Sequence, residues 1–376
     1  MSLPLGTLLA TLEALAPLEL AEDWDNTGLL MDPRAPGEEL AVERVLLTID
    51  ATEAVIQEAV ALGAQCLVAY HPPLFAPKKR FARGADPVVF TAAAHGIAVY
   101  SPHTALDAAP LGLNDWLAQG LGAGRVEPLF PATPPESNDL KLVVFVPEDH
   151  ADALRDALAE AGAGVIGAYS RCSFTLSGEG TFFGHEGTNP AVGSSGQLER
   201  VPELRLEMVC PRRALPAAAR AIARVHPYEE PAWDVYPLVP RPRSGAGPGR
   251  RLVLDTPAPL TEIAERSKRH LGLAHLAVAA SGRHRSGEPV RTIALAAGAG
   301  GSLFERGSGI DLYVTGEMRH HDVLAKLASG ASVLLAGHSN TERGYLPTLR
   351  ARLLEATSGH LEITLSTFDR EPLDIV

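Results

Sequence analysis

Short apolar runs alternate with longer amphipathic stretches along the first third of the chain. The apolar runs of strand length are residues 44–50, 66–70 and 97–101. Residues 53–64, EAVIQEAVALGA, have the spacing of a helix that Thr52 can cap, and a second helix is expected at residues 87–95. Continuous apolar runs separated by helices predict parallel strands that are covered on both faces of their sheet.

The last third of the chain repeats this pattern. Its apolar runs are residues 292–298, 311–316 and 332–337. In both thirds polar side chains follow the runs, and ligands of parallel α/β sheets bind at the carboxyl ends of the strands. The sequence therefore predicts an α/β protein in which two similar halves form one core.

The middle of the chain has a different pattern. Residues 140–162 and 204–227 each predict a strand followed by a helix. Shorter strand candidates, YSRCSFTLSG and AWDVYPL, lie between and after them. This order fits a βαββαβ ferredoxin-like α+β domain of about 100 residues.

Two stretches rich in proline and glycine separate these parts. Residues 127–137 and 239–250 lack any periodicity and predict linkers. We therefore expect a discontinuous core of residues 1–130 plus 248–376. Residues 138–240 are expected to form a domain inserted into this core at an exposed loop.

Composition and charge narrow the classes of partner. The chain has 376 residues, is 46% hydrophobic, and has a formal charge of −12 from 33 basic and 45 acidic residues. Because no basic stripe is present, binding of a nucleic-acid backbone is not expected, although a local pocket could hold an anion. An aromatic content of 5% argues against stacking platforms for single strands. A small-molecule substrate is the expected partner.

Cysteine usage and hydropathy predict a cytoplasmic protein without membrane contact. Cys66, Cys172 and Cys210 lie far apart and form no CxxC pair, which favours free thiols in a reducing compartment. The N-terminal stretch lacks a positively charged region and carries Glu13, so it reads as a helix and not as a signal peptide. No uncharged apolar stretch of about 18 residues occurs.

Two strand ends carry the same motif, H-x3-[DE]. The first pairs His103 with Asp107, and the second pairs His338 with Glu342. If a helical turn begins there, residues four apart share one face, so each imidazole lies beside a carboxylate. Nitrogen and oxygen ligands of this kind suit Zn²⁺, Fe²⁺, Mn²⁺ or Ni²⁺.

Further candidate residues follow two other strands. His71 ends one apolar run, and Glu317 ends another, with His320 and His321 directly after it. A single histidine at a strand end is usually a hydrogen-bonding residue, and a carboxylate at a helix start usually complements the helix dipole. The convergence of four such ends in two matching halves instead favours one shared metal site.

Two weaker motifs have open interpretations. The glycine-rich turn at residues 298–302 could bind a phosphate through its amides, or could simply require glycine for a tight turn. The motif HPYEEP, residues 226–231, could bind a ligand or could be a structural turn, and the turn is favoured.

Five motifs together resemble the Nif-three-like family of dinuclear-metal proteins, also called GTP cyclohydrolase 1 type 2 homologues. They are WDNTGL (24–29), YHPPLF (70–75), HTALD (103–107), TGEMRHH (315–321) and GHSNTE (337–342). The resemblance covers the whole chain, and the middle domain looks like the PII/CutA-like insertion of the longer bacterial members. It implies a homo-oligomer, a toroidal hexamer built as a trimer of dimers.

The resemblance also implies a ligand set. The implied metal ligands are His71, Asp107, His338 and Glu342, and Glu342 would bridge two ions. Many members have two consecutive histidines where this chain has Tyr70 followed by His71. One or two ions per subunit are therefore expected.

Four residues are expected to surround these ligands, namely Tyr70, His103, Asp25 and Asn26. His103 could replace the missing ligand or could orient Asp107 from behind. Asp25 and Asn26, next to Trp24, match the motif that the family places near the site, although the same loop could serve only in packing.

The expected function is metal-dependent hydrolysis of a nucleotide or phosphoester-type small molecule. A divalent cation makes hydroxide available at neutral pH and polarises a substrate oxygen. Glu317 is the expected proton carrier, with His321 in reserve. The alternative is a non-catalytic protein that senses or stores metal, or a regulatory scaffold whose inserted domain binds an effector.

Overall fold

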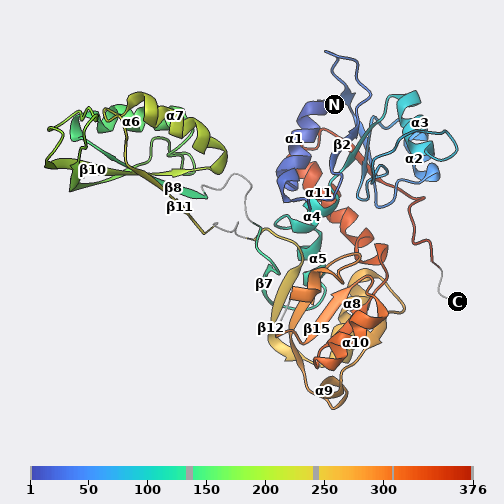
Figure 1. Ribbon diagram of the computed structural model, residues 1–376. Coiled ribbons are helices and arrows are strands. Elements are labelled where there is room, and N and C mark those ends of the chain that lie inside the picture. The colour runs from blue at the N-terminus through green and yellow to red at the C-terminus, as the bar shows by residue number, and fades with distance from the viewer. Residues whose placement is uncertain (1, 133–138, 240–244, 307–308, 374–376) are drawn as a thin grey trace. The chain divides into compact units, whose positions relative to one another are not determined.

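The computed structural model describes residues 2–132, 139–239, 245–306 and 309–373 (Figure 1). The chain forms two compact units. The core unit is Met1–Ala132 with Arg243–Val376, and the inserted unit is Thr133–Pro242. Each unit is described separately below.

The first sheet of the core unit has five strands in the order β17-β4-β5-β6-β2. The strands are β4 (Arg44–Thr48), β5 (Cys66–Ala69), β6 (Ala98–Ser101), β17 (Glu362–Leu365) and β2 (Gly28–Met31). All neighbours are parallel except β2, which runs antiparallel to β6. The expected parallel arrangement of the first three apolar runs is thus confirmed.

Both faces of this sheet are buried, as the continuous apolar runs predict. Val45 and Leu47 belong to one hydrophobic cluster, whereas Leu46 between them belongs to another. The second cluster is covered by α2 (Glu53–Ala61) and α3 (Pro87–His95). Thr52 caps α2, because its side chain accepts a hydrogen bond from the Val55 amide at 3.3 Å.

The second sheet of the core unit has six strands in the order β13-β16-β15-β14-β12-β7. The strands are β14 (Val290–Leu295), β15 (Leu312–Thr315), β16 (Ser332–Leu335), β13 (Ala277–Ala279), β12 (Arg250–Ala258) and β7 (Gly124–Pro128). The first three are parallel, as expected. The other three are antiparallel additions that the apolar pattern did not indicate.

Two of these additional strands, β7 and β12, include residues that were predicted to be linkers. Residues 127 and 128 belong to β7, and residue 250 begins β12. The two strands pair directly, with Arg250 opposite Pro128. Hydrogen bonding between the chain entering the insertion and the chain leaving it made strands out of residues whose sequence has no strand pattern.

A central cluster joins the two sheets. It contains Val45 and Leu47 from the first sheet and Leu312 and Val314 from the second, so the two halves share one core. Figure 1 shows α4, α5 and α11 between the sheets. The remaining helices of the core unit are α1 (Leu5–Leu15), α4 (His103–Ala108), α5 (Leu113–Gln119), α8 (Leu260–Leu271), α9 (Gly282–Arg285), α10 (His320–Ala328) and α11 (Leu346–Ala356).

Short elements complete the core unit. They are the paired strands β1 (Leu3–Pro4) and β3 (Ala41–Val42) and the 3₁₀ turns η1 (Leu18–Leu20), η3 (Leu303–Arg306), η4 (Ser339–Thr341) and η5 (Arg343–Tyr345). The turns η4 and η5 flank Glu342, so the segment after β16 begins with 3₁₀ turns and becomes an α-helix only at Leu346.

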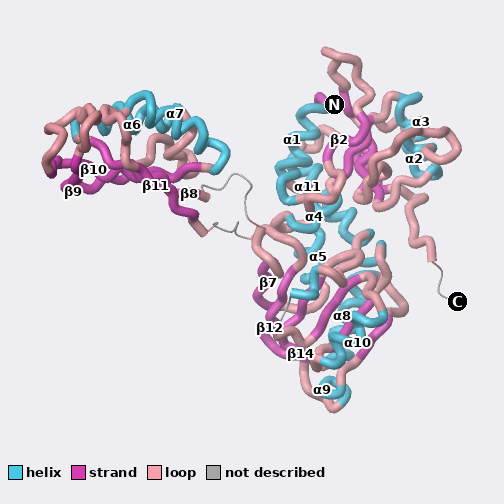
Figure 2. The backbone as a smooth tube through the Cα atoms, in the orientation of Figure 1, coloured by secondary structure: helices cyan, strands magenta, loops and turns pink. Residues whose placement is uncertain are grey.

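The inserted unit contains one antiparallel sheet in the order β11-β8-β10-β9. Its elements follow the chain as β8 (Leu140–Val146), α6 (Glu148–Glu160), β9 (Phe174–Phe183), β10 (Leu198–Cys210), η2 (Arg212–Ala214), α7 (Leu215–Val225) and β11 (Trp233–Pro237). Figure 2 shows both helices on one side of the sheet. Alternate residues of β8, such as Leu142 and Val144, pack against them.

Within the described residues no helix combines the length and apolarity needed to cross a bilayer. Cys66 and Cys210 are buried, Cys172 is half-buried, and all three are free thiols.

Candidate metal centre

Three side chains from both halves of the core unit converge. His71 follows β5, His338 follows β16, and Glu342 lies between η4 and η5. Each offers one ligand atom, and these atoms lie within 4.8 Å of one another. The Glu342 carboxylate lies between the imidazoles, with Oε2 3.5 Å from His71 Nε2 and Oε1 3.4 Å from His338 Nε2.

The residues around this cluster fit a bound cation. Glu342 is only 1% exposed, and in the described part of the chain its buried Oε2 accepts no hydrogen bond, which is costly without a compensating charge. Gly298 approaches from behind with φ +59°, and a Cβ there would lie 2.8 Å from Glu342 Oε1 and 3.0 Å from His338 Nε2. Two imidazole nitrogens and a carboxylate are a ligand set for divalent transition metals.

Asp50 orients His71 from behind. Its Oδ1 lies 2.9 Å from His71 Nδ1, so that Nε2 is the nitrogen turned toward Glu342. Burial alone would lower the pKa of His71, but the hydrogen bond to Asp50 and the negative charge of the adjacent Glu342 raise that pKa to about 10. Two carboxylates therefore surround this imidazole with negative charge, as in carboxylate–histidine–metal arrangements.

Asp50 was not among the site residues predicted from the sequence, although the sequence contains a signal for it. Asp50 is the last residue of the apolar run 44–50. Polar residues at the ends of the other apolar runs are candidate ligands, and Asp50 has the same position at the end of run 44–50.

Asp107 lines the same cavity but lies outside the three-residue cluster. Its Oδ1 accepts a hydrogen bond from the Tyr70 hydroxyl at 2.7 Å. Burial raises the pKa of Asp107 to about 7, and burial together with the Asp107 charge raises the pKa of Tyr70 well above its usual value. Tyr70 thus binds one of the two carboxylate oxygens of Asp107, and Oδ2 is the oxygen left for the expected ligand role.

One expectation was that His103 orients Asp107, but no hydrogen bond joins these two side chains among the described residues. His103 Nδ1 instead pairs with Asp25 Oδ1 at 2.7 Å, and the fully buried Asp25 also accepts the Thr104 amide at 3.1 Å. Burial alone would raise the pKa of Asp25, but the His103 and Thr104 hydrogen bonds lower it. His103 has φ +27°, a strained conformation of the kind found at functional sites. Asn26 donates a hydrogen bond to the Leu74 carbonyl.

The two expected proton carriers lie in different places. Glu317 is exposed, and its Oε1 lies 3.6 Å from His338 Nδ1. His321 is exposed at the start of α10, in ring contact with His320, and is not among the residues that line the cavity. The structure therefore brings Glu317 to the cluster but does not bring His321.

The cluster lies in a cavity of about 810 Å³. Its walls come from both halves and include Tyr70, Phe130 and Leu303. The glycine-rich turn also lines it, but two of its amides are already used, because Gly298 donates to Thr341 Oγ1 at 2.8 Å and Gly300 donates to Thr315 Oγ1 at 2.9 Å. This favours the tight-turn interpretation over a phosphate cradle.

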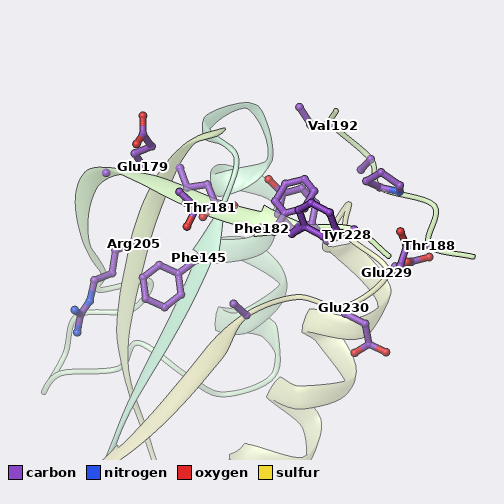
Figure 3. Close-up of a pocket in the computed structure, with 18 of the residues that line it drawn as sticks. Phe145, Glu179, Thr181, Phe182, Thr188, Val192, Arg205, Tyr228, Glu229 and Glu230 are labelled. Carbon is purple, nitrogen blue, oxygen red and sulfur yellow. The ribbon is translucent and has the colours of Figure 1, made fainter. Parts of the chain in front are cut away.

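A second cavity, of about 690 Å³, lies in the inserted unit (Figure 3). The motif HPYEEP contributes Tyr228, Glu229 and Glu230 to its lining. His226 itself has a structural role, because Nε2 donates to the Phe145 carbonyl at 2.8 Å and Nδ1 accepts the Tyr228 amide at 3.1 Å. The Tyr228 hydroxyl is buried and has no hydrogen-bond partner among the described residues.

Comparison with known proteins gives matches over the whole chain. A family profile described as Duf34/NIF3 (NGG1p interacting factor 3) matches residues 4–372. NIF3-like protein 1 of Bos taurus is 35% identical over 379 residues, which cover 99% of this chain and 92% of the relative. The GTP cyclohydrolase 1 type 2 homolog of Halalkalibacterium halodurans is 33% identical over 377 residues, which cover 98% of each chain.

Solved structures give the same result. The Bacillus cereus protein related to NIF3 is 32% identical, with a TM-score of 0.63 and coverage of 100% of this chain and 99% of that one. Staphylococcus aureus protein SA1388 has a TM-score of 0.74 at 24% identity, covering 100% of this chain and 99% of that one, and this likeness concerns the fold alone.

Proposed function

Because the chain belongs to the Duf34/NIF3 family and brings two imidazoles and a buried carboxylate together in one cavity, we propose that it is a metal-dependent hydrolase. The proposed substrate is a nucleotide or phosphoester-type small molecule. The name of the Halalkalibacterium halodurans relative, a GTP cyclohydrolase 1 type 2 homolog, supports a nucleotide. The observation that carries the proposal is the buried Oε2 of Glu342, which lacks a hydrogen bond beside His71.

Three residues would hold the cation in this proposal, namely His71, His338 and Glu342. The cluster of three ligand atoms found among the described residues supports one ion per subunit in this proposal. When bound, a divalent cation supplies a Lewis acid that activates water and polarises a substrate oxygen.

The protein's own groups have separate tasks. Asp50 fixes the orientation of the His71 ring. Glu317 is the proposed proton carrier, because its carboxylate is exposed to solvent and lies beside the cluster, 3.6 Å from His338 Nδ1. The burial of Glu342 keeps water away from its carboxylate, which strengthens its electrostatic interactions.

The alternative function, a metal sensor or regulatory scaffold, has one observation in its favour. The inserted unit contains its own cavity, which is lined by Tyr228 and by the carboxylates of Glu203, Glu229 and Glu230. We propose that this unit is ferredoxin-like and PII/CutA-like, on the basis of its strand order, and that an effector binds in it if the protein is regulatory. Assembly as a homohexamer stays a prediction.

The experiment compares metal content and turnover in the full-length chain. Wild type and Glu342→Ala would be analysed for bound metal by plasma mass spectrometry and assayed with nucleotides and phosphoesters. We expect metal in the wild type and loss of both metal and turnover in the variant. Glu355→Ala, an exposed substitution on α11, is the matched control and should behave as wild type. Bound metal without turnover of any substrate would favour the regulatory alternative.

A further inference from the structure

Three large aromatic side chains are exposed beside the metal centre. Trp24, Phe75 and Phe81 are 60%, 53% and 49% exposed. Trp24 and Phe75 line the cavity of the metal centre, and all three line a hollow of about 380 Å³ that adjoins it. Exposing apolar rings to water is unfavourable, so their exposure at one place is typical of a binding surface.

Two of these rings, those of Trp24 and Phe75, are held in place although they are exposed. Trp24 lies 5.9 Å from Phe75 and 6.1 Å from His103 between ring centroids, and Phe75 lies 6.3 Å from His103. The buried Asp25 fixes His103, and Asn26 ties the Trp24 loop to the Leu74 carbonyl. An ordered group of aromatic faces loses little conformational entropy when a planar ring stacks on it.

Positive charge is concentrated in the chain segment that carries Phe81. Residues 76–85, APKKRFARGA, contain four basic residues and no acidic residue, although the whole chain has a charge of −12. Lys78 pairs with Asp86, and the Arg83 guanidinium lies over the Phe90 ring. Lys79 and Arg80 are exposed, and in the part of the chain that the structure describes neither forms an ion pair.

We propose that this surface is the recognition subsite for a nucleoside phosphate, a proposal that rests on the proposed function and narrows its substrate class. The base stacks on Trp24 and Phe75 at the mouth of the cavity. Lys79 and Arg80 supply positive charge for the phosphate. A cavity of about 810 Å³ is in the size range of small-molecule sites.

The test measures binding directly by calorimetry on the full-length, metal-loaded protein. AMP, GMP and UMP are compared with adenosine and with ribose 5-phosphate, which each lack one half of the ligand. We expect each nucleotide to bind more tightly than both fragments. Equal binding of ribose 5-phosphate and AMP would overturn the stacking role.

Variants separate the two halves of the subsite. Trp24→Ala and Phe75→Ala should each weaken AMP binding roughly tenfold, as expected for one lost stacking contact, and should leave ribose 5-phosphate binding unchanged. Lys79→Gln with Arg80→Gln should weaken both phosphates and reduce the salt dependence of binding. The matched controls are Trp233→Ala in the inserted unit and Arg350→Gln on α11, which belong neither to the aromatic group nor to the basic segment 76–85.

Other outcomes overturn the proposal. Wild-type affinity in both aromatic variants would do so, as would failure of all nucleotides to bind at millimolar concentration. Tighter binding of a ten-residue oligothymidylate than of UMP would assign the surface to single strands. Metal content measured on the same samples separates the two proposals: nucleotide binding without metal contradicts only the proposed function, and metal without nucleotide binding contradicts only the subsite.

Discussion

Gly298 shows how closely the metal cluster depends on one backbone position. Its φ is +59°, and the space where a Cβ would stand is already bounded by Glu342 Oε1 and His338 Nε2. The glycine therefore has two functions, a left-handed turn and the close approach of the backbone to two ligand atoms.

Gly298→Ala tests the second function. The methyl group would displace Glu342 or His338, and we expect metal affinity to fall on the order of 10- to 100-fold, as when ligand orientation is disturbed. Affinity would be measured by competition with a chelating dye. Gly272→Ala is the matched control, because Gly272 has φ +70° and nothing lies within 4 Å of its added Cβ. Equal losses in both variants would mean that backbone strain alone is responsible.

At the scale of elements, a carboxylate aligns two parallel strands. Asp311, just before β15, accepts hydrogen bonds from the amides of Arg291 and Thr292 on β14 at 2.9 and 2.8 Å. It also forms an ion pair with Arg283 at 2.5 Å. Burial alone would raise the pKa of Asp311, but these contacts lower it below its usual value of 3.8. The ionised form is therefore the one that stabilises the fold.

Asp311→Asn should reduce the free energy of unfolding by about 1–3 kcal/mol at neutral pH, because the amide cannot accept all these bonds. A carboxyl group with a lowered pKa stabilises the fold above its unfolded pKa, and this contribution is lost as the pH falls through the folded value. The difference between wild type and variant should thus shrink below about pH 4. Chemical denaturation of wild type and variant at several values between about pH 3 and pH 7 checks this. A difference in the free energy of unfolding that does not change with pH would contradict it.

Much of the element-scale organisation was predictable. The six apolar runs became parallel strands, and Thr52 caps the expected helix. The edge strands β7 and β13, and β12 between β14 and β7, were missed because their strand structure depends on antiparallel partners from distant parts of the chain.

At the scale of the whole molecule, one buried arginine holds the point where the chain returns from the insertion. Arg250 is 1% exposed and forms a two-point ion pair with Asp115 on α5, at 2.6 and 3.0 Å. It also donates to the carbonyls of Gly247, Gly249 and Ala109. The sequence placed this residue at the end of a linker.

Arg250→Met should destabilise the core unit by about 3–5 kcal/mol, because it leaves Asp115 and three carbonyls without their donor. Scanning calorimetry of the full-length chain would follow the transition of each unit separately. Arg251→Met is the matched control, because this neighbour is partly exposed and its pair with Glu127 contributes about 0–1 kcal/mol. A similar loss in both variants would assign the effect to β12 in general.

The candidate site was predictable only in part. Strand ends pointed to His71, His338, Glu342 and Glu317, and the structure places all four together. Strand ends could not show that Tyr70 binds Asp107 or that Asp25 binds His103, because each contact joins α4 to a segment distant along the chain.

The sequence by itself determined where strands end and which ligand-type side chains stand at those ends, because apolar periodicity and strand termini are local properties of a chain. Only the tertiary structure decided which ends meet. His71 and Glu342 are distant along the chain and come within 3.5 Å because two sheets bury a common core between them. Packing also decided that the exposed side chains of Trp24 and Phe75 line the cavity of the metal centre. The amino-acid composition contains no information about where these aromatic side chains lie.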